Sequence, residues 1–263
     1  MVRQPQRGET MILDQFSLTG KVAMVTGCRT GLGQGMAYGL AEAGADIVGI
    51  DHIDFSETES RIKSMGRKFL GIKADLSSLE PIAGTMLKTI ATFGKLDILV
   101  NNAGIIRRAD AIEFTEKDWD DVMNLNIKTL FFLSQAAARQ FLKQKTRGKI
   151  INVASMLSFQ GGIRVPSYTA SKSGVMGVTR LMANEWAKFN INVNAIAPGW
   201  FATNNTAALR ADPVRNSEIL GRIPAGRWGS PDDLKGAVVF LASDASHYVN
   251  GFTIAVDGGW LAR

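Results

Sequence analysis

Tyr168 and Lys172 have the residue types and the spacing that could most directly do chemistry. They stand four residues apart in a segment with a helical pattern, so a helix places both side chains on one face. A free tyrosine has a pKa of about 10, too high for efficient proton transfer at neutral pH, and a nearby ammonium favours the phenolate. The pair predicts a proton donor and acceptor for a carbonyl or an alcohol, with an ordinary surface pair as the alternative.

Ser155 lies thirteen residues before Tyr168, just after a predicted strand at residues 149–153. Open parallel sheets bind ligands at the carboxyl ends of their strands, where a hydroxyl can hydrogen-bond a carbonyl or alcohol oxygen. Asn126 falls inside a predicted helix, although asparagine is a poor helix former. We expect it either to be tolerated there or to serve a polar network.

A glycine-rich turn at Thr26–Gly33 follows the first predicted strand and opens a helix. Glycines let the backbone approach a pyrophosphate, and the helix offers free N–H groups and the positive end of its dipole. The turn therefore predicts a dinucleotide site, although a tight turn can need glycine for its own sake. The predicted contacts are Gly27, Arg29, Thr30, Gly31, Leu32 and Gly33, with Asn102, Ala103 and Gly104 after another strand.

Asp51 ends the second predicted strand, 18 residues beyond Gly33, close to the separation of about 20 expected for a ribose ligand. A carboxylate accepts both ribose hydroxyls and repels a 2′-phosphate, so NAD is predicted over NADP. Arg29 is the opposing feature, because a loop arginine could pair with that phosphate. The alternative for Asp51 is a carboxylate that only caps a loop.

Short apolar segments alternate with longer helical patterns along the chain. Segments that are apolar throughout are typical of parallel strands buried on both faces, and the alternation predicts an α/β fold with a doubly wound parallel sheet. We expect one domain over residues 16–263, a flexible extension over 1–15 and a mobile lid over about 200–223. The predicted strands are 22–26, 46–50, 68–73, 98–100, 149–153, 192–196 and 253–256; the predicted helices are 33–43, 79–93, 116–145, 168–189 and 231–242.

The composition suits a globular protein, with 46% hydrophobic and 21% charged residues among 263. The one cysteine, Cys28, excludes an internal disulfide, and we expect a reducing compartment, the cytoplasm. The sequence has no apolar run of about 18 residues, so no membrane span is predicted. Residues 1–10 lack the apolar core of a secretory signal. The net charge is +6, but the basic residues are scattered, so a solvated surface is favoured over nucleic-acid binding.

These motifs together resemble the short-chain dehydrogenase/reductase family over residues 16–263. The resemblance implies a Rossmann-type domain with about seven parallel strands, helices on both faces and a homotetramer. It implies that Tyr168 is the general acid/base and that Lys172 lowers its pKa and holds the nicotinamide ribose. It also implies that Ser155 orients the substrate oxygen and that Asn126 holds a water of a proton relay. Further cofactor contacts implied are Asp75 and Leu76 near adenine, Pro198 and Gly199, and Thr203 at the carboxamide.

Segments 105–108, 116–126, 155–168 and 202–206 resemble family members that act on sugar acids. They imply interconversion of 2-dehydro-3-deoxy-D-gluconate and 3-deoxy-D-glycero-2,5-hexodiulosonate in pectin and hexuronate breakdown. A related substrate such as gluconate or 2-deoxygluconate is the alternative. A non-catalytic NAD-sensing protein is a more distant one, and it would be expected to lack Ser155, Tyr168 or Lys172.

A sugar acid needs a cation for its carboxylate and neutral groups for its hydroxyls. The arginines near predicted site elements are Arg107, Arg108 and Arg164, and we expect Arg107 or Arg164 to pair with the carboxylate. A solvated or interface arginine is the alternative for each. Gln160 and Asn204 are predicted polar contacts, and no metal site is predicted.

Overall fold

One seven-stranded parallel sheet forms the centre of the molecule, in a computed structural model that describes residues 11–263. The strand order is β3-β2-β1-β4-β5-β6-β7, which confirms the predicted doubly wound α/β fold. Burial along β1 is complete, as expected for a central parallel strand with helices on both faces. The strands are β1 Val22–Thr26, β2 Asp46–Asp51, β3 Phe69–Lys73, β4 Ile98–Asn101, β5 Gly148–Val153, β6 Ile191–Pro198 and β7 Thr253–Val256.

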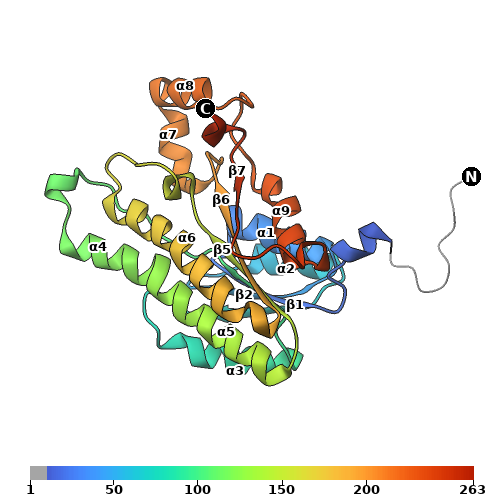
Figure 1. The fold of residues 1–263 in the computed structure, drawn as a ribbon. Coiled ribbons are helices and arrows are strands. Elements are labelled where there is room, and N and C mark those ends of the chain that lie inside the picture. Colours follow the sequence, from blue (N-terminus) through green and yellow to red (C-terminus); the bar gives the residue numbers. More distant parts are fainter. Residues whose placement is uncertain (1–10) are drawn as a thin grey trace, which may run out of the picture.

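Helices cover both faces of the sheet (Figure 1). One apolar cluster joins the sheet to α3, α5 and α6, and a second joins it to α1 and α9 on the other face. Proline begins α3, α6 and α8, where its missing N–H costs nothing. The helices are α1 Gly31–Glu42, α2 Ser56–Ser64, α3 Pro81–Phe93, α4 Glu116–Met123, α5 Leu130–Gln144, α6 Pro166–Trp186, α7 Ala207–Ala211, α8 Pro213–Arg222 and α9 Lys235–Ala242.

The strand order reverses between β1 and β4, and this reversal creates the crevice in which doubly wound sheets bind ligands. The side chain of Asn102, just after β4, donates to the carbonyls of Thr26 and Gly27 at 2.9 and 3.0 Å. Thr26 Oγ1 in turn accepts from the amides of Asn102 and Ala103, both at 2.9 Å. The two loops that border the crevice are therefore joined.

The helix predicted over residues 116–145 is not continuous. Asn124–Thr129 form a π-helical segment between α4 and α5. Such segments are rare and often occur at functional sites. Asn126 lies in this segment, and its side chain bonds the loop after β4 rather than its own helix. Of the two expectations for Asn126, the structure therefore agrees with the polar network.

The segment predicted as a lid folds as a turn followed by α7 and α8, and it lies beside the C-terminus (Figure 1). Trp200 packs edge-to-face against Trp228 and Trp260, with ring centroids 5.7 and 5.8 Å apart. Arg222 of α8 lies over the Trp260 ring at 4.1 Å, and Arg263 donates to the carbonyl of Gly221. The C-terminal residues thus hold α8.

The structure describes only the last five residues, 11–15, of the predicted N-terminal extension. Its residues 1–10 lie outside the described residues. Ile12–Phe16 form a short 3₁₀ turn, and the Phe16 ring lies 6.3 Å from that of Phe240. This apolar contact gives the end of the extension a regular conformation.

Candidate active site

Tyr168 and Lys172 lie one turn apart on α6, and Lys172 Nζ is 5.6 Å from the centre of the Tyr168 ring. Lys172 is 4% exposed, and its Nζ donates to the carbonyl of Val153 at 2.6 Å. Burial lowers the pKa of Lys172 to about 8. The structure therefore brings the predicted pair together at the carboxyl end of β5.

Burial raises the pKa of Tyr168 above its ordinary value. A hydrogen bond with Ser155 and the positive charge of Arg108 act in the opposite direction. Lys172 was expected to provide this lowering, but its Nζ is bonded to a backbone carbonyl in the structure. The effect of Lys172 on Tyr168 stays a prediction, and Arg108, which the sequence offered only as an arginine near the site, is an additional charge that acts on Tyr168.

Ser155 is positioned by the 3₁₀ turn that follows β5. Its Oγ accepts from the amide of Leu157 at 3.1 Å, while Ser158 Oγ donates to the carbonyl of Lys172 at 2.6 Å. This second bond ties the turn to α6 and so holds Ser155 beside Tyr168. The four predicted catalytic residues meet here, because Asn126 also reaches α6.

Asn126 is 1% exposed, and its amide group is fully engaged. Its Oδ1 accepts from the amide of Ile105 at 2.9 Å, and its Nδ2 donates to the Ile105 carbonyl at 3.0 Å and to Ser171 Oγ at 3.2 Å. Asn126 thus fastens the loop after β4 to the helix that carries Tyr168. Its predicted role in a water relay stays a prediction.

The glycine-rich turn has the shape that a pyrophosphate requires. A Cβ on Gly33 would lie 2.1 Å from the Gly27 carbonyl, so only glycine permits this close crossing. Gly31 begins α1 with φ +60°, and no side chain caps the free N–H groups of that helix. Thr203 lies 3.4 Å from the position that a Cβ on Gly31 would take. The residues present fit a dinucleotide with its phosphates at the start of α1, and the predicted contact of Thr203 with the carboxamide stays a prediction.

Asp51 ends β2 beside this turn. Its Oδ2 accepts from the amide of Arg29 at 3.2 Å, and its Oδ1 accepts from the amide of His52 at 2.9 Å. Cys28 in the same turn is buried, and burial raises the pKa of its thiol to about 12, so the thiol is neutral. Among residues 11–263, Asp51 is the one carboxylate hydrogen-bonded to the turn, as a ribose ligand would be.

The remaining predicted cofactor residues follow other strands at the same edge. Asp75 is exposed after β3 and accepts from the amide of Ser77, which lowers its pKa. The Leu76 side chain is buried in the core, so its predicted contact with a ligand would have to come from its backbone. Pro198 ends β6, and the next residue, Gly199, has no room for a Cβ because Asp257 would lie 2.6 Å away.

The two arginines expected to bind a carboxylate are each paired with acidic side chains. Arg107 lies 3.4 Å from Asp118 and 3.5 Å from Asp121, and Arg164 lies 3.0 Å from Asp110. Arg108 has no ion pair among residues 11–263, and its charge reaches Tyr168. The position of Arg108 next to Arg107 was visible in the sequence, but which of the two faces the site was not.

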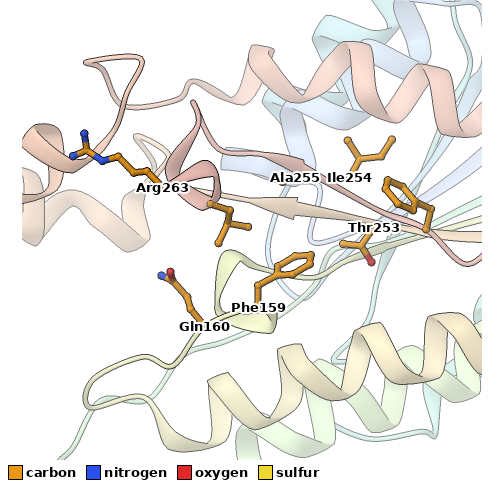
Figure 2. A pocket seen from close by; sticks show the side chains of 8 residues that line it. Phe159, Gln160, Thr253, Ile254, Ala255 and Arg263 are labelled. Carbon is orange, nitrogen blue, oxygen red and sulfur yellow. The ribbon is translucent and has the colours of Figure 1, made fainter.

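Gln160 accepts a hydrogen bond from Arg222 of α8 at 3.3 Å. It borders a surface groove of about 570 Å³ together with Phe159, Thr253 and Arg263 (Figure 2). Asn204 is exposed in the turn before α7. Neither residue has a contact with Tyr168 or Ser155, so their roles as substrate ligands stay predictions.

Within residues 11–263, no cluster of three or more histidine, cysteine or acidic side chains could hold a metal ion. None of the helices between residues 11 and 263 combines the length and the hydropathy that a bilayer-spanning segment needs.

The chain is similar to known proteins over almost its whole length. A family model described as Enoyl-(Acyl carrier protein) reductase matches residues 27–261. The 2-dehydro-3-deoxy-D-gluconate 5-dehydrogenase of Escherichia coli (strain K12) is 71% identical over 253 residues, which cover 96% of this chain and 100% of that protein.

Solved structures of similar proteins contain a bound dinucleotide. A putative 2-deoxy-D-gluconate 3-dehydrogenase from Agrobacterium tumefaciens, with bound NADP, is 55% identical, with a TM-score of 0.88 over 95% of this chain and 100% of that one. A putative NAD(P) dependent gluconate 5-dehydrogenase from Beutenbergia cavernae, with NADP at low occupancy, is 46% identical, with a TM-score of 0.90 and the same coverage.

Proposed function

Because this chain belongs to the short-chain dehydrogenase/reductase family and is an oxidoreductase acting on CH–OH groups, we propose that it interconverts 2-dehydro-3-deoxy-D-gluconate and 3-deoxy-D-glycero-2,5-hexodiulosonate. The observation that carries this substrate is the 71% identity with the E. coli enzyme over 96% of the chain. The reaction belongs to pectin and hexuronate breakdown, and the single cysteine favours a reducing compartment, the cytoplasm.

The chemistry rests on the side chains gathered at the end of β5. The nicotinamide cofactor, when bound, accepts or supplies the hydride. Ser155 hydrogen-bonds the reacting oxygen of the sugar acid, and the Tyr168 hydroxyl takes its proton in oxidation or returns it in reduction. Proton transfer by a positioned side chain contributes about 10²- to 10⁴-fold to a rate. Lys172 holds the cofactor ribose and lowers the pKa of Tyr168, while Asn126 fixes the loop that closes the site.

The cofactor of the proposed reaction is NAD(H). Support comes from Asp51, which ends β2 beside the glycine-rich turn and whose carboxylate would repel a 2′-phosphate. The Agrobacterium and Beutenbergia structures contain NADP, so family members of this kind accept the phosphorylated cofactor too. We therefore expect the preference of this chain for NAD or NADP to depend on the residues around Asp51.

Arg108 is the cation that we assign to the substrate carboxylate. It is free of ion pairs among residues 11–263, unlike Arg107 and Arg164, and its charge acts on Tyr168. Arg107 and Arg164 then serve to hold the loop around Arg108.

The test is a comparison of substrates with the purified protein. We expect 3-deoxy-D-glycero-2,5-hexodiulosonate to be reduced with NADH, and 2-dehydro-3-deoxy-D-gluconate to be oxidised with NAD. Gluconate and 2-deoxygluconate should give a kcat/KM at least about tenfold lower, which corresponds to about 1.4 kcal/mol. A higher kcat/KM with gluconate would instead support the function named for the Beutenbergia relative.

A further inference from the structure

His52 follows the proposed ribose ligand, and its imidazole faces that ligand. His52 Nδ1 lies 3.2 Å from Asp51 Oδ1, the oxygen that also accepts from the backbone amide of His52. The side chain of Asp51 is 9% exposed, whereas that of His52 is 68% exposed. The imidazole therefore lies between the buried carboxylate and solvent.

Charged groups from three elements surround this histidine. Asp51 ends β2, and Asp75 after β3 has its pKa lowered in part by the charge of His52. Arg29, after β1, donates its amide to Asp51. On the same loop as His52, Asp54 is bonded to Ser56 and faces the positive charge of Lys73 at the end of β3.

The net charge beside the proposed ribose site depends on the charge of His52. Asp54 and Lys73 offset each other, which leaves the carboxylates of Asp51 and Asp75 beside the imidazole. With a neutral imidazole these two carboxylates repel a 2′-phosphate. A protonated His52 reduces that negative charge, pairs with Asp51, and still has a second N–H to donate to an anion.

We propose that His52 makes the cofactor preference of this enzyme depend on pH, with NAD(H) favoured when His52 is neutral and NADP(H) accepted when His52 is protonated. The proposal rests on the proposed ribose site at Asp51. Histidine side chains in general change charge between pH 5 and 8.

The experiment measures dissociation constants of NADH and NADPH by fluorescence, with no sugar acid present, so that it is independent of the proposed substrate. Titrations are made at about pH 6 and about pH 8, on either side of the range in which histidine changes charge, at equal ionic strength. The variant is His52→Gln, which is tolerated because the side chain is exposed. The matched control is His247→Gln, the second of the two histidines, whose backbone carbonyl bonds Asn192 at the opposite end of β6 from the site.

We expect the ratio of the NADPH to the NADH dissociation constant to fall about three- to tenfold from pH 8 to pH 6 in the wild type, as expected for one screened charge acting on a nearby phosphate. His247→Gln should behave like the wild type. His52→Gln should keep only the small change that comes from titration of the 2′-phosphate itself. The proposal is wrong if His52→Gln keeps the full wild-type change, or if the wild-type ratio does not vary with pH.

Discussion

The surroundings of Tyr168 disfavour the phenolate that its proposed role in proton transfer requires. Burial raises its pKa, and the interaction with Ser155 and the charge of Arg108 lower it only in part. Lys172 is also buried and directs its Nζ to the Val153 carbonyl. A positively charged nicotinamide beside Tyr168 would favour the phenolate further. At the scale of single residues, proton transfer is therefore expected to depend on cofactor binding.

Replacement of Arg108 tests the assignment of the substrate carboxylate. Arg108→Met should raise KM for the sugar acid about 10- to 100-fold, because a charge-assisted hydrogen bond is worth about 1.5–3 kcal/mol. Arg107→Met is the matched control, since Arg107 already pairs with Asp118 and Asp121. Steady-state kinetics decide, and an equal or larger rise in KM for Arg107→Met would refute the assignment.

A second prediction for a single residue concerns Lys149 and the pH dependence of the free energy of unfolding. Lys149 is 5% exposed in β5, its side chain hydrogen-bonds Ser246 alone among residues 11–263, and burial lowers its pKa to about 8. Between this value and the ordinary 10.5 the unfolded chain binds more protons, so stability rises with pH by up to about 1.4 kcal/mol per pH unit.

Denaturant unfolding across this pH range measures the effect of Lys149. The free energy of unfolding should rise less with pH in Lys149→Met than in the wild type. Lys143→Met, at an exposed lysine, is the control and should behave like the wild type. If the stability of Lys149→Met rises with pH as steeply as that of the wild type, the buried ammonium is not the cause.

At the scale of elements, two features position the site from outside it. The π-helical segment turns Asn126 toward Ile105 and Ser171, which joins the loop after β4 to α6. The C-terminal turn holds α8 through the contact of Trp260 with Arg222. The first fixes the catalytic residues relative to one another, and the second holds the segment proposed to cover the substrate.

The contact between Trp260 and Arg222 that holds α8 can be removed by substitution of Trp260. Trp260→Ala removes a side chain that is 5% exposed, and we expect about 3–5 kcal/mol of destabilisation, faster proteolysis near α8 and a higher KM. Trp260→Phe keeps an apolar ring and should have a smaller effect of the same sign. Tyr248→Ala, at a fully exposed aromatic, is the control. Unchanged proteolysis near α8 in Trp260→Ala would show that another contact holds the helix.

The sequence predicts most elements, and the exceptions have physical causes. The strand at residues 22–26 has its predicted bounds because all five side chains are buried. The helix Ser56–Ser64 was not predicted, since it is short and buries only Thr58 and Ile62. The π-helical segment was not predicted either, because its irregularity depends on a tertiary bond of Asn126. Likewise, neither the ion pair of Arg107 nor the freedom of Arg108 follows from their adjacent positions.

At the scale of the whole molecule, apolar side chains remain exposed on the outer helices of one face. Phe132 and Leu142 of α5 and Leu181 of α6 are 38%, 46% and 48% exposed, and a groove of about 230 Å³ runs between these helices. Exposed apolar patches mark interaction sites. This surface supports the homotetramer implied by the family resemblance.

Replacement of one of these side chains tests the tetramer. Leu181→Glu should lower the mass measured by light scattering from that of a tetramer to that of a dimer or monomer, because it places a charge in an apolar contact. Leu87→Glu, at a residue of α3 that is 72% exposed, is the control and should leave the mass unchanged. A wild-type protein that is monomeric at micromolar concentration would contradict this expectation.

The most direct test of the central claim is single-residue replacement at Tyr168, measured by NADH oxidation with 3-deoxy-D-glycero-2,5-hexodiulosonate. Tyr168→Phe removes only the hydroxyl, so kcat should fall by about 10²- to 10⁴-fold while the dissociation constant of NADH stays nearly the same. Turnover within about tenfold of the wild type would contradict the assignment of Tyr168 as the proton donor and acceptor.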